Sequence, residues 1–318
     1  MNNSKLDTLL RFTCRAGAFL VACFPGLALA AGATETAVAW WIWPLALFVV
    51  CFVLGMIAVP AGVGGGVLFV PIVSGFFPFH LDFVRGAGLM VALASALAAG
   101  PGLLRMGLAD IRLALPLTLL ASICAIVGAL AGLALPAAAV ETALGITILC
   151  IAVMMWRAKK SEYPDVAQPD PLAAALRMNG LFHDHALNRD VAWRVHRTPL
   201  ALVLFGGIGM LAGLFGLGAG WANVPVLNLV MGAPLKLSAG TSGFILSIVD
   251  SSAAWVYINK GALLAVIAVP SVIGMMLGAF IGARLLRVLN ASVIRKLVVV
   301  ILVLAGARAL SKGLGWWT

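Results

Sequence analysis

The chain of 318 residues is 63% hydrophobic and only 10% charged, with a mean hydropathy of +1.11. This number of charged side chains is too small to cover the surface of a water-soluble domain. The composition therefore excludes a water-soluble protein and predicts a membrane protein. The formal net charge of +10 arises mostly from Lys and Arg between apolar segments. It therefore indicates membrane topology and membrane lipid as a partner, and we expect no binding of nucleic acid.

Residues 1–30 have the layout of a secretory signal peptide. Three basic residues precede an apolar stretch that closes with an A-x-A pattern at Ala30. The alternative is an uncleaved first transmembrane helix that is broken at Pro25. Both interpretations place residues 31–40 outside the cytoplasm.

Residues 40–156 and 198–314 each contain five apolar spans that suit transmembrane helices, for which about 18 or more residues are needed. The spans of the first half are 40–60, 66–79, 82–101, 111–134 and 138–156, and those of the second are 198–217, 221–233, 237–257, 262–284 and 292–311. The second span of each half is too short for an ordinary crossing. We therefore predict an all-α polytopic membrane protein of two transmembrane repeats, each with one short broken helix.

The segment 157–197 joins the two repeats and carries seven Lys and Arg residues. Positive residues near span ends mark the cytoplasmic side, so we expect a basic cytoplasmic linker in a multi-pass membrane protein. A solvated linker is the simpler interpretation. Leu187, Val191 and Val195 recur every four residues, which also allows an amphipathic helix on the membrane surface.

The glycines and prolines of the two halves align without a gap when one half is shifted by 154 positions. Gly55, for example, aligns with Gly209 (209 − 55 = 154). The same shift pairs Gly62, Gly64, Gly66, Pro71, Gly86, Gly107, Pro116 and Gly128 with Gly216, Gly218, Gly220, Pro225, Gly240, Gly261, Pro270 and Gly282. Five spans per half is an odd number, so similar halves would enter the membrane from opposite sides as inverted structural repeats of about five helices each. If the short spans are re-entrant, the count is even and the copies are parallel.

Each repeat interrupts its apolar sequence at the same place, with GVGGGVLFVP from Gly62 and GLGAGWANVP from Gly216. Inside lipid, such irregular backbone must line a protein-enclosed or wet cavity, and a helix that begins after it presents amides that favour an anion. We therefore predict a substrate site where the two breaks face each other. Its candidate residues are Gly64, Gly65, Gly66, Gly218 and Gly220. The alternative is that these glycines only permit close helix packing.

Polar side chains cluster after the second break. Asn223 lies in the first turn of the second short helix and can offer its amide to a bound anion. Ser238, Thr241 and Ser242 open the next span, where their hydroxyls can bind an oxyanion or bond a carbonyl one turn back.

Two ionisable residues are further candidates. Arg85 aligns with Ala239 of the other half and can act as an anion clamp, because guanidinium offers a planar fork of donors. The alternative is an interface residue that pairs with Asp82. Asp250 stands well inside a span, so it is a candidate carrier of a coupling proton. A structural partner or a place near the outer mouth are its alternatives.

Other chemistry has little support in the sequence. The five cysteines lie in apolar stretches without a CxxC pair, and His183 and His185 lack a third ligand at a credible spacing. We therefore expect no metal site and no cofactor. Because no nucleophile–base arrangement emerges, we also expect that the protein is not an enzyme.

GVGGGVLFVPIV and GLGAGWANVPVL, followed in the second half by AGTS, resemble the TauE/SafE family of sulfite and organosulfonate exporters over about residues 45–312. The resemblance implies a secondary transporter that exports a small sulfur-containing oxyanion, such as sulfite or sulfoacetate, across the inner membrane. An anion channel, or a carrier for another small anion such as a carboxylate, sulfate or thiosulfate, is the alternative. The first half has Ala87 and Gly88 where the second has Thr241 and Ser242, so the exact substrate and the oligomeric state stay open.

Overall fold

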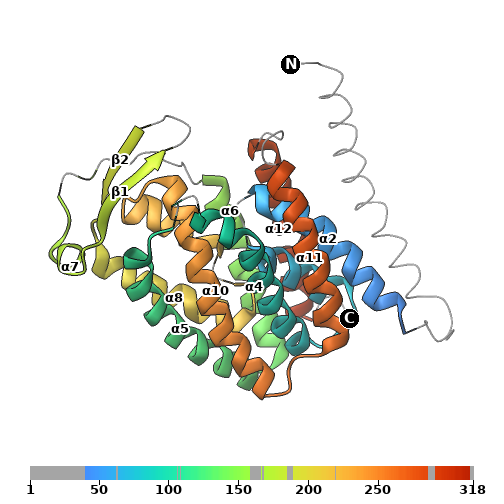
Figure 1. Cartoon of the computed structure of the whole chain (residues 1–318). Helices are drawn as coiled ribbons and strands as arrows, with labels where there is room; N and C mark the ends of the chain where they lie inside the picture. Colours follow the sequence, from blue (N-terminus) through green and yellow to red (C-terminus); the bar gives the residue numbers. More distant parts are fainter. Residues whose placement is uncertain are drawn as a thin grey trace, which may run out of the picture. The chain divides into compact units, whose positions relative to one another are not determined.

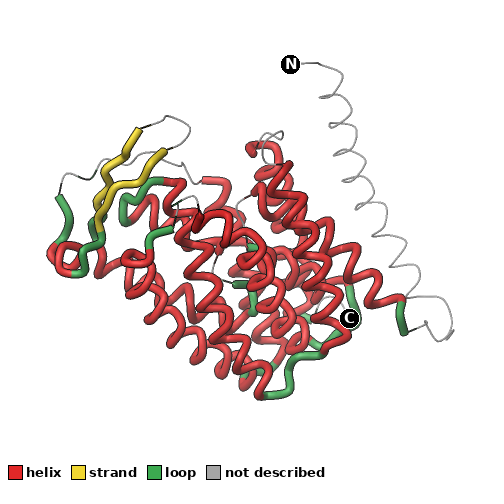
Figure 2. The backbone as a smooth tube through the Cα atoms, in the orientation of Figure 1, coloured by secondary structure: helices red, strands yellow, loops and turns green. Residues whose placement is uncertain are grey.

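The structure is a computed structural model, and it describes residues 40–61, 64–105, 107, 109–157, 166, 168–184, 189–218, 220–285 and 291–315. The expectation for residues 1–30 lies outside them. From Trp43 onward the chain forms one compact unit, and the description that follows concerns this unit. Its described residues are almost entirely helical, apart from one two-stranded hairpin and the connecting loops (Figure 2).

The helices follow the predicted spans closely. The first repeat contains α2 (Ile42–Ala61), α3 (Gly65–Phe76), α4 (Leu81–Arg105), α5 (Ile111–Ala134) and α6 (Ala137–Arg157). The second contains α8 (Thr198–Phe215), α9 (Gly220–Pro225), the π-helix η1 (Val226–Val230), α10 (Leu235–Asn259), α11 (Ala265–Leu285) and α12 (Ala291–Gly313). Within the described residues, six helices are long and apolar enough to cross a membrane: α4, α5, α6, α8, α10 and α11. The prediction of a polytopic helical membrane protein is confirmed.

The sequence offset reappears in the helix boundaries. α4, α5 and α6 begin at residues 81, 111 and 137, and α10, α11 and α12 begin at residues 235, 265 and 291. Each helix of the second set therefore starts 154 residues after its counterpart, which is the shift that aligns the glycines. The last three helices of the two halves therefore have the same spacing, whereas the π-helix η1 occurs in the second half and not in α3.

Glycines bring one helix of each repeat directly against the other repeat. In the first pairing, a Cβ added at Gly55 of α2 would lie 2.6 Å from the carbonyl oxygen of Met275 in α11. In the second, Gly209 and Gly213 of α8 face the carbonyls of Ala121 and Ala125 in α5 at similarly close range. Both residue numbers rise together along α5 and α8, so these two helices run parallel. Small residues permit this contact between backbones, which is how helices associate in lipid.

The short broken helix of each repeat returns toward the start of the long helix before it. The ring of Phe77, just after α3, lies 5.8 Å from that of Trp43 at the start of α2. In the second repeat, the amide of His196, just before α8, donates to the carbonyl oxygen of Met231, just after η1, at 3.0 Å. Each long helix and its short successor therefore form a hairpin with the glycine break at its bend.

The last helices of the two repeats pack side by side in opposite directions. A Cβ at Gly145 of α6 would lie 2.6 Å from the amide nitrogen of Leu310 in α12, and one at Gly313 would meet Thr142. Residue numbers thus rise along α6 as they fall along α12. At one end of this pair, Lys312 Nζ lies 2.8 Å from Glu141 Oε1.

The linker is more ordered than a solvated segment. It contains α7 (Pro171–Ala175) and the antiparallel strands β1 (Asn179–Asp184) and β2 (Arg189–Arg194), which form a hairpin beside the helices (Figure 1). The alternative of an amphipathic helix through Val191 is wrong, because Val191 lies in β2. Leu187 lies outside the described residues. Trp193 and Val195 are buried in the same apolar cluster as residues of α5, α8 and α10, so the linker docks on the membrane helices.

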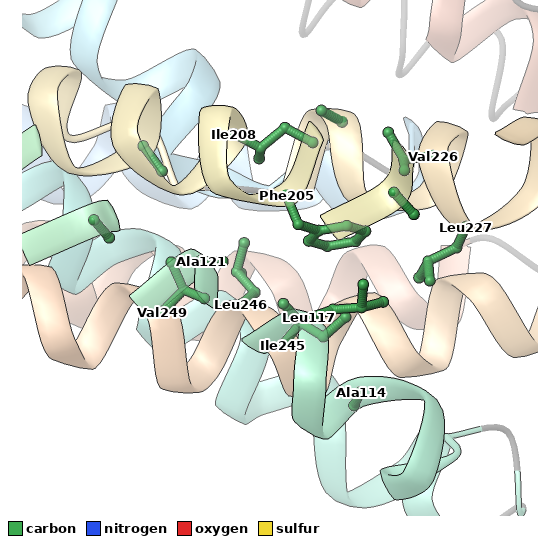
Figure 3. Close-up of a cluster of buried hydrophobic side chains, with 14 of the residues drawn as sticks. Ala114, Leu117, Ala121, Phe205, Ile208, Val226, Leu227, Ile245, Leu246 and Val249 are labelled. Atoms are coloured by element: carbon green, nitrogen blue, oxygen red, sulfur yellow. The ribbon is translucent and has the colours of Figure 1, made fainter. Parts of the chain in front are cut away.

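The main apolar cluster lies where α5, α8, η1 and α10 meet. Figure 3 shows the ring of Phe205 between the side chains of α8 and η1 on one side and those of α5 and α10 on the other. Leu117, Ile245 and Val249 are completely buried there. The cluster fixes the second repeat against α5, and it holds the second glycine break in place.

We expect Gly209→Ala to destabilise the protein by about 1–3 kcal/mol, because its methyl group would be forced into the backbone of α5. Gly207 lies on the same helix with no atom within 4 Å of an added Cβ, so Gly207→Ala is the matched control. Thermal unfolding in detergent should show a lower midpoint for the first variant only. Equal midpoints would contradict the packing of α5 on α8.

Candidate functional site

The two glycine breaks meet in the structure. A Cβ added at Gly220 would lie 3.3 Å from both the Cα and the nitrogen of Gly64, and one at Gly64 would lie 3.8 Å from the Cα of Gly220. Leu246 of α10 packs against both positions, with its Cδ1 atom 3.3 Å and 4.0 Å from the added Cβ atoms. The start of α3 and the start of α9 therefore touch through bare backbone, and we call this contact the glycine crossing.

Several glycines around the crossing are required by packing alone. A Cβ at Gly66 would lie 2.5 Å from the carbonyl oxygen of Leu217, and Gly88 of α4 is pressed against the carbonyl of Gly216. Gly216 and Gly218 also have positive φ values of 68° and 72°, a backbone conformation that side chains disfavour. Close packing, the alternative that the sequence left open, thus accounts for part of each glycine motif.

Two polar side chains lie beside the crossing. Ser95 of α4 accepts a hydrogen bond from the amide of Gly65 at 3.4 Å and donates to the carbonyl of Ala92 at 2.8 Å. Asp250 of α10 is completely buried, and its Oδ2 lies 3.0 Å from the position of a Cβ at Gly218. Ser95 therefore supplies one of the partners that an interrupted helix needs inside lipid, while Asp250 places a carboxyl group at the second break.

Asn223 is a buried polar side chain without a hydrogen-bond partner among the described residues. It lies in α9 and is completely buried. Among the described residues, neither its Nδ2 nor its Oδ1 has a hydrogen-bond partner. The indole nitrogen of Trp221, two residues earlier, is also buried without a partner in that part of the chain. A buried amide without partners costs about 1–3 kcal/mol, so such a group needs a reason, and a bound ligand is one.

Two of the three hydroxyls predicted on α10 hydrogen-bond to other parts of the protein. Ser238 donates to the carbonyl of Pro234 one turn back at 2.9 Å, and Thr241 accepts from the amide of Asp110 at 3.1 Å. Ser242 is buried. At 1.5 Å per residue, Ser238 lies about 12 Å along α10 from Leu246, which contacts the crossing. The observed bonds of Ser238 and Thr241 join elements of the protein to each other.

Arg85 is buried and bonded to the protein on several sides. Its Nη1 donates to the carbonyl oxygens of Gly132 and Leu214 at 3.1 and 3.0 Å, and its Nη2 donates to Gly132 at 3.1 Å and pairs with Asp82. Only 1% of the residue is exposed. The guanidinium therefore joins α4 to the ends of α5 and α8. The pairing with Asp82, which was the alternative interpretation of the sequence, is present. The role of Arg85 as an anion clamp stays a prediction.

A model of the family described as "Sulfite exporter TauE/SafE" matches residues 47–309. The chain belongs to this family. The match spans both repeats, the linker and the glycine crossing, and it identifies a membrane transporter rather than an enzyme at the level of the family. The comparisons found no match among curated proteins and none among solved structures.

Sequence reasoning missed Ser95 and Trp221. The 154-residue offset aligns Ser95 with Val249, which is the neighbour of Asp250. Each repeat therefore has a polar residue at nearly the same position, in α4 and α10 respectively, and this similarity could have pointed to Ser95. Trp221 offered no such signal, because an aromatic residue in an apolar helix is usually part of the core.

We expect Asn223→Leu to leave the folded protein as stable as the parent or more stable by about 1 kcal/mol, because it removes an unsatisfied buried amide. We expect sulfite to raise the melting temperature of the parent protein, and the Asn223→Leu variant should lose that rise.

Asn228→Leu is the matched control. Its Nδ2 donates to the carbonyl oxygen of Ala233 at 2.8 Å, so this variant should lose about 1 kcal/mol of stability and keep the response to sulfite. If Asn223→Leu is the destabilised variant of the two, Asn223 is a structural residue.

Proposed function

We propose that this protein exports a small sulfur-containing oxyanion, sulfite or an organosulfonate such as sulfoacetate, across the bacterial inner membrane as a secondary transporter. Membership of the TauE/SafE family supports a transporter of this substrate class. The observation that carries the proposal is the glycine crossing with the buried, unpartnered amide of Asn223 in the adjoining helix. Backbone amides and neutral side-chain donors bind an oxyanion well in a site from which water is excluded.

Inverted repeats are part of the proposal. Equivalent helices run parallel when two copies are related by an axis along the membrane normal, and antiparallel when the axis lies in the membrane plane. α6 and α12 are equivalent by the sequence offset and run antiparallel, which supports the second arrangement. The return of each short helix to the start of its hairpin supports an odd number of passages per repeat.

The distribution of charge supports the orientation. The linker has seven Lys and Arg residues, whereas the turn between α5 and α6, residues 135–136, has none. Excess positive charge marks the cytoplasmic side, so the linker end would face the cytoplasm. The turns before α4 and after α10 would then face outward.

The mechanism that we propose is alternating access. The two breaks are in contact at Gly64 and Gly220, so the backbone leaves no gap at this point. Passage of an anion would require the starts of α3 and α9 to separate, and rocking of one repeat against the other about the crossing provides that movement. The amide of Asn223 would bind the anion near the crossing, while Arg85, Ser238, Thr241 and Ser242 remain candidate substrate residues.

A substrate panel in proteoliposomes tests the proposal. We expect saturable transport of sulfite, and of sulfoacetate or another organosulfonate, with weak or no transport of short carboxylates at equal concentration. Sulfate, thiosulfate and taurine complete the panel. Transport restricted to carboxylates would overturn the substrate class, and large unitary currents would show a channel.

Asp250 is proposed as the carrier of a coupling proton, because it is buried at the second break. We expect Asp250→Asn to abolish anion accumulation driven by an imposed pH gradient, since an amide cannot take up and release the proton. Exchange of labelled for unlabelled anion without a gradient should persist. Undiminished gradient-driven flux in the variant would reject the coupling role.

A further inference from the structure

An open pocket of about 590 Å³ lies at the end of α10 that is away from the linker. Its walls come from the start of α4, the end of α5 and the turn between α10 and α11. The lining includes His80, Asp82, Phe83, Leu133, Lys260 and Ala262. It opens at the face that the proposed orientation places outside the cell.

Arg85 and its hydrogen-bond partners adjoin the pocket. Asp82 lines the pocket and pairs with the guanidinium of Arg85, and Gly132, which accepts from both Nη1 and Nη2, is the neighbour of the lining residue Leu133. We call Arg85 with Asp82, Gly132 and Leu214 the Arg85 clasp. Arg85 is only 1% exposed, so the clasp is buried beside the open pocket.

The clasp holds the second glycine break directly. Leu214, which accepts from Arg85 Nη1 at 3.0 Å, lies two residues before Gly216. A Cβ added at Gly216 would lie 2.6 Å from the Cα of Arg85, so the backbones touch as well. The hydroxyl of Tyr257 donates to the carbonyl of Gly213 at 3.0 Å and adds a further tie. Release of the clasp would therefore free the segment that leads to Gly218 and the glycine crossing.

The charges in the pocket favour an anion. Asp82 is neutralised by its pairing with Arg85, which leaves Lys260 as the charge that faces the open space. His80, whose side chain is 61% exposed, lies with its Nδ1 3.5 Å from Asp82 Oδ2 and offers a ring nitrogen. A partly enclosed pocket with one unbalanced cation attracts a small oxyanion more strongly than the open surface does.

We propose that this pocket is an outer binding site for the transported oxyanion and that the Arg85 clasp is the gate beneath it. The proposal rests on the proposed function and orientation. The offset aligns Arg85 with Ala239, so the opposite end of the molecule has no equivalent guanidinium. The clasp that Arg85 forms at the outer end therefore has no counterpart at the aligned position of the second repeat.

Thiol labelling tests the gate. In a background with the five native cysteines replaced, Phe83→Cys places a thiol in the pocket, and Ala92→Cys places one below the clasp, where Ala92 is buried against Gly218. A membrane-impermeant maleimide added outside should label the first variant readily and the second slowly. Adding Asp82→Asn should speed labelling of the Ala92→Cys variant about tenfold, because a charge-assisted hydrogen bond holds a two-state gate by at least that factor.

His80→Gln is the matched control, because it changes a polar side chain of the same pocket and leaves the clasp intact; it should not speed labelling of the Ala92→Cys variant. If Asp82→Asn protein does not fold, Arg85→Lys replaces it, since the ammonium cannot reach all of the partners of the guanidinium. An unchanged labelling rate in a folded variant overturns the gate. Labelling of the Phe83→Cys variant only from the cytoplasmic side overturns the outer location.

Protection from labelling tests the binding site. Methanesulfonate, which does not react with maleimide, should slow labelling of the Phe83→Cys variant in a saturable manner. Lys260→Gln should remove this protection, whereas Lys236→Gln, at the other end of α10, should keep it. Absence of protection overturns the oxyanion site. Both assays work without transport, so failure of the sulfite flux assay with intact protection would count against the proposed function, whereas absence of protection with intact flux would count against the outer site.

Discussion

The architecture depends on a contact between two stretches of backbone that carry no side chains. Gly64 and Gly220 approach so closely that an ordinary residue at position 220 would bring a Cβ within 3.3 Å of the opposing backbone. Interrupted helices inside lipid need partners for their free amides, and the fold supplies one from the hydroxyl of Ser95. The long helices around the crossing, held by their own glycine contacts, keep the two breaks opposed.

The backbone of the two repeats is alike, but their side chains are not. The offset aligns Asn223 with Phe69, and Phe69 is completely buried as an ordinary core residue. It likewise aligns Asp250 with Ala96 and Arg85 with Ala239. The second repeat thus contributes the amide and the carboxyl group near the crossing, while the first contributes the guanidinium at the end of α4. The two repeats thus share the spacing of their long helices and differ in the polar side chains at these positions.

Hydropathy and the glycine offset predicted the helices well, because lipid requires long apolar helices and the offset repeats their boundaries. The predicted span 111–134 coincides with α5. The hairpin in the linker was not predicted. The four-residue spacing of Val191 and Val195 suggested a helix, but a spacing of so few residues also arises by chance. The pairing of Arg85 with Asp82 could be predicted, because the two residues are three positions apart in the sequence. The bonds of Arg85 to Gly132 and Leu214 could not be predicted, because every residue has a backbone carbonyl and the sequence does not show which one lies nearby.

The unequal ends of the molecule bear on the proposed transport cycle. In an exporter built from inverted repeats, exchanging the conformations of the two halves converts one end state into the other. That exchange would be balanced only if the same bonds closed both ends. Here a buried guanidinium joins α4 to α5 and α8 at one end, whereas at the start of α10 the bond between Thr241 and the amide of Asp110 joins α10 to α5. Because charge-assisted bonds are stronger than neutral ones, the proposed gate predicts that the state closed at the Arg85 end is favoured in the absence of substrate.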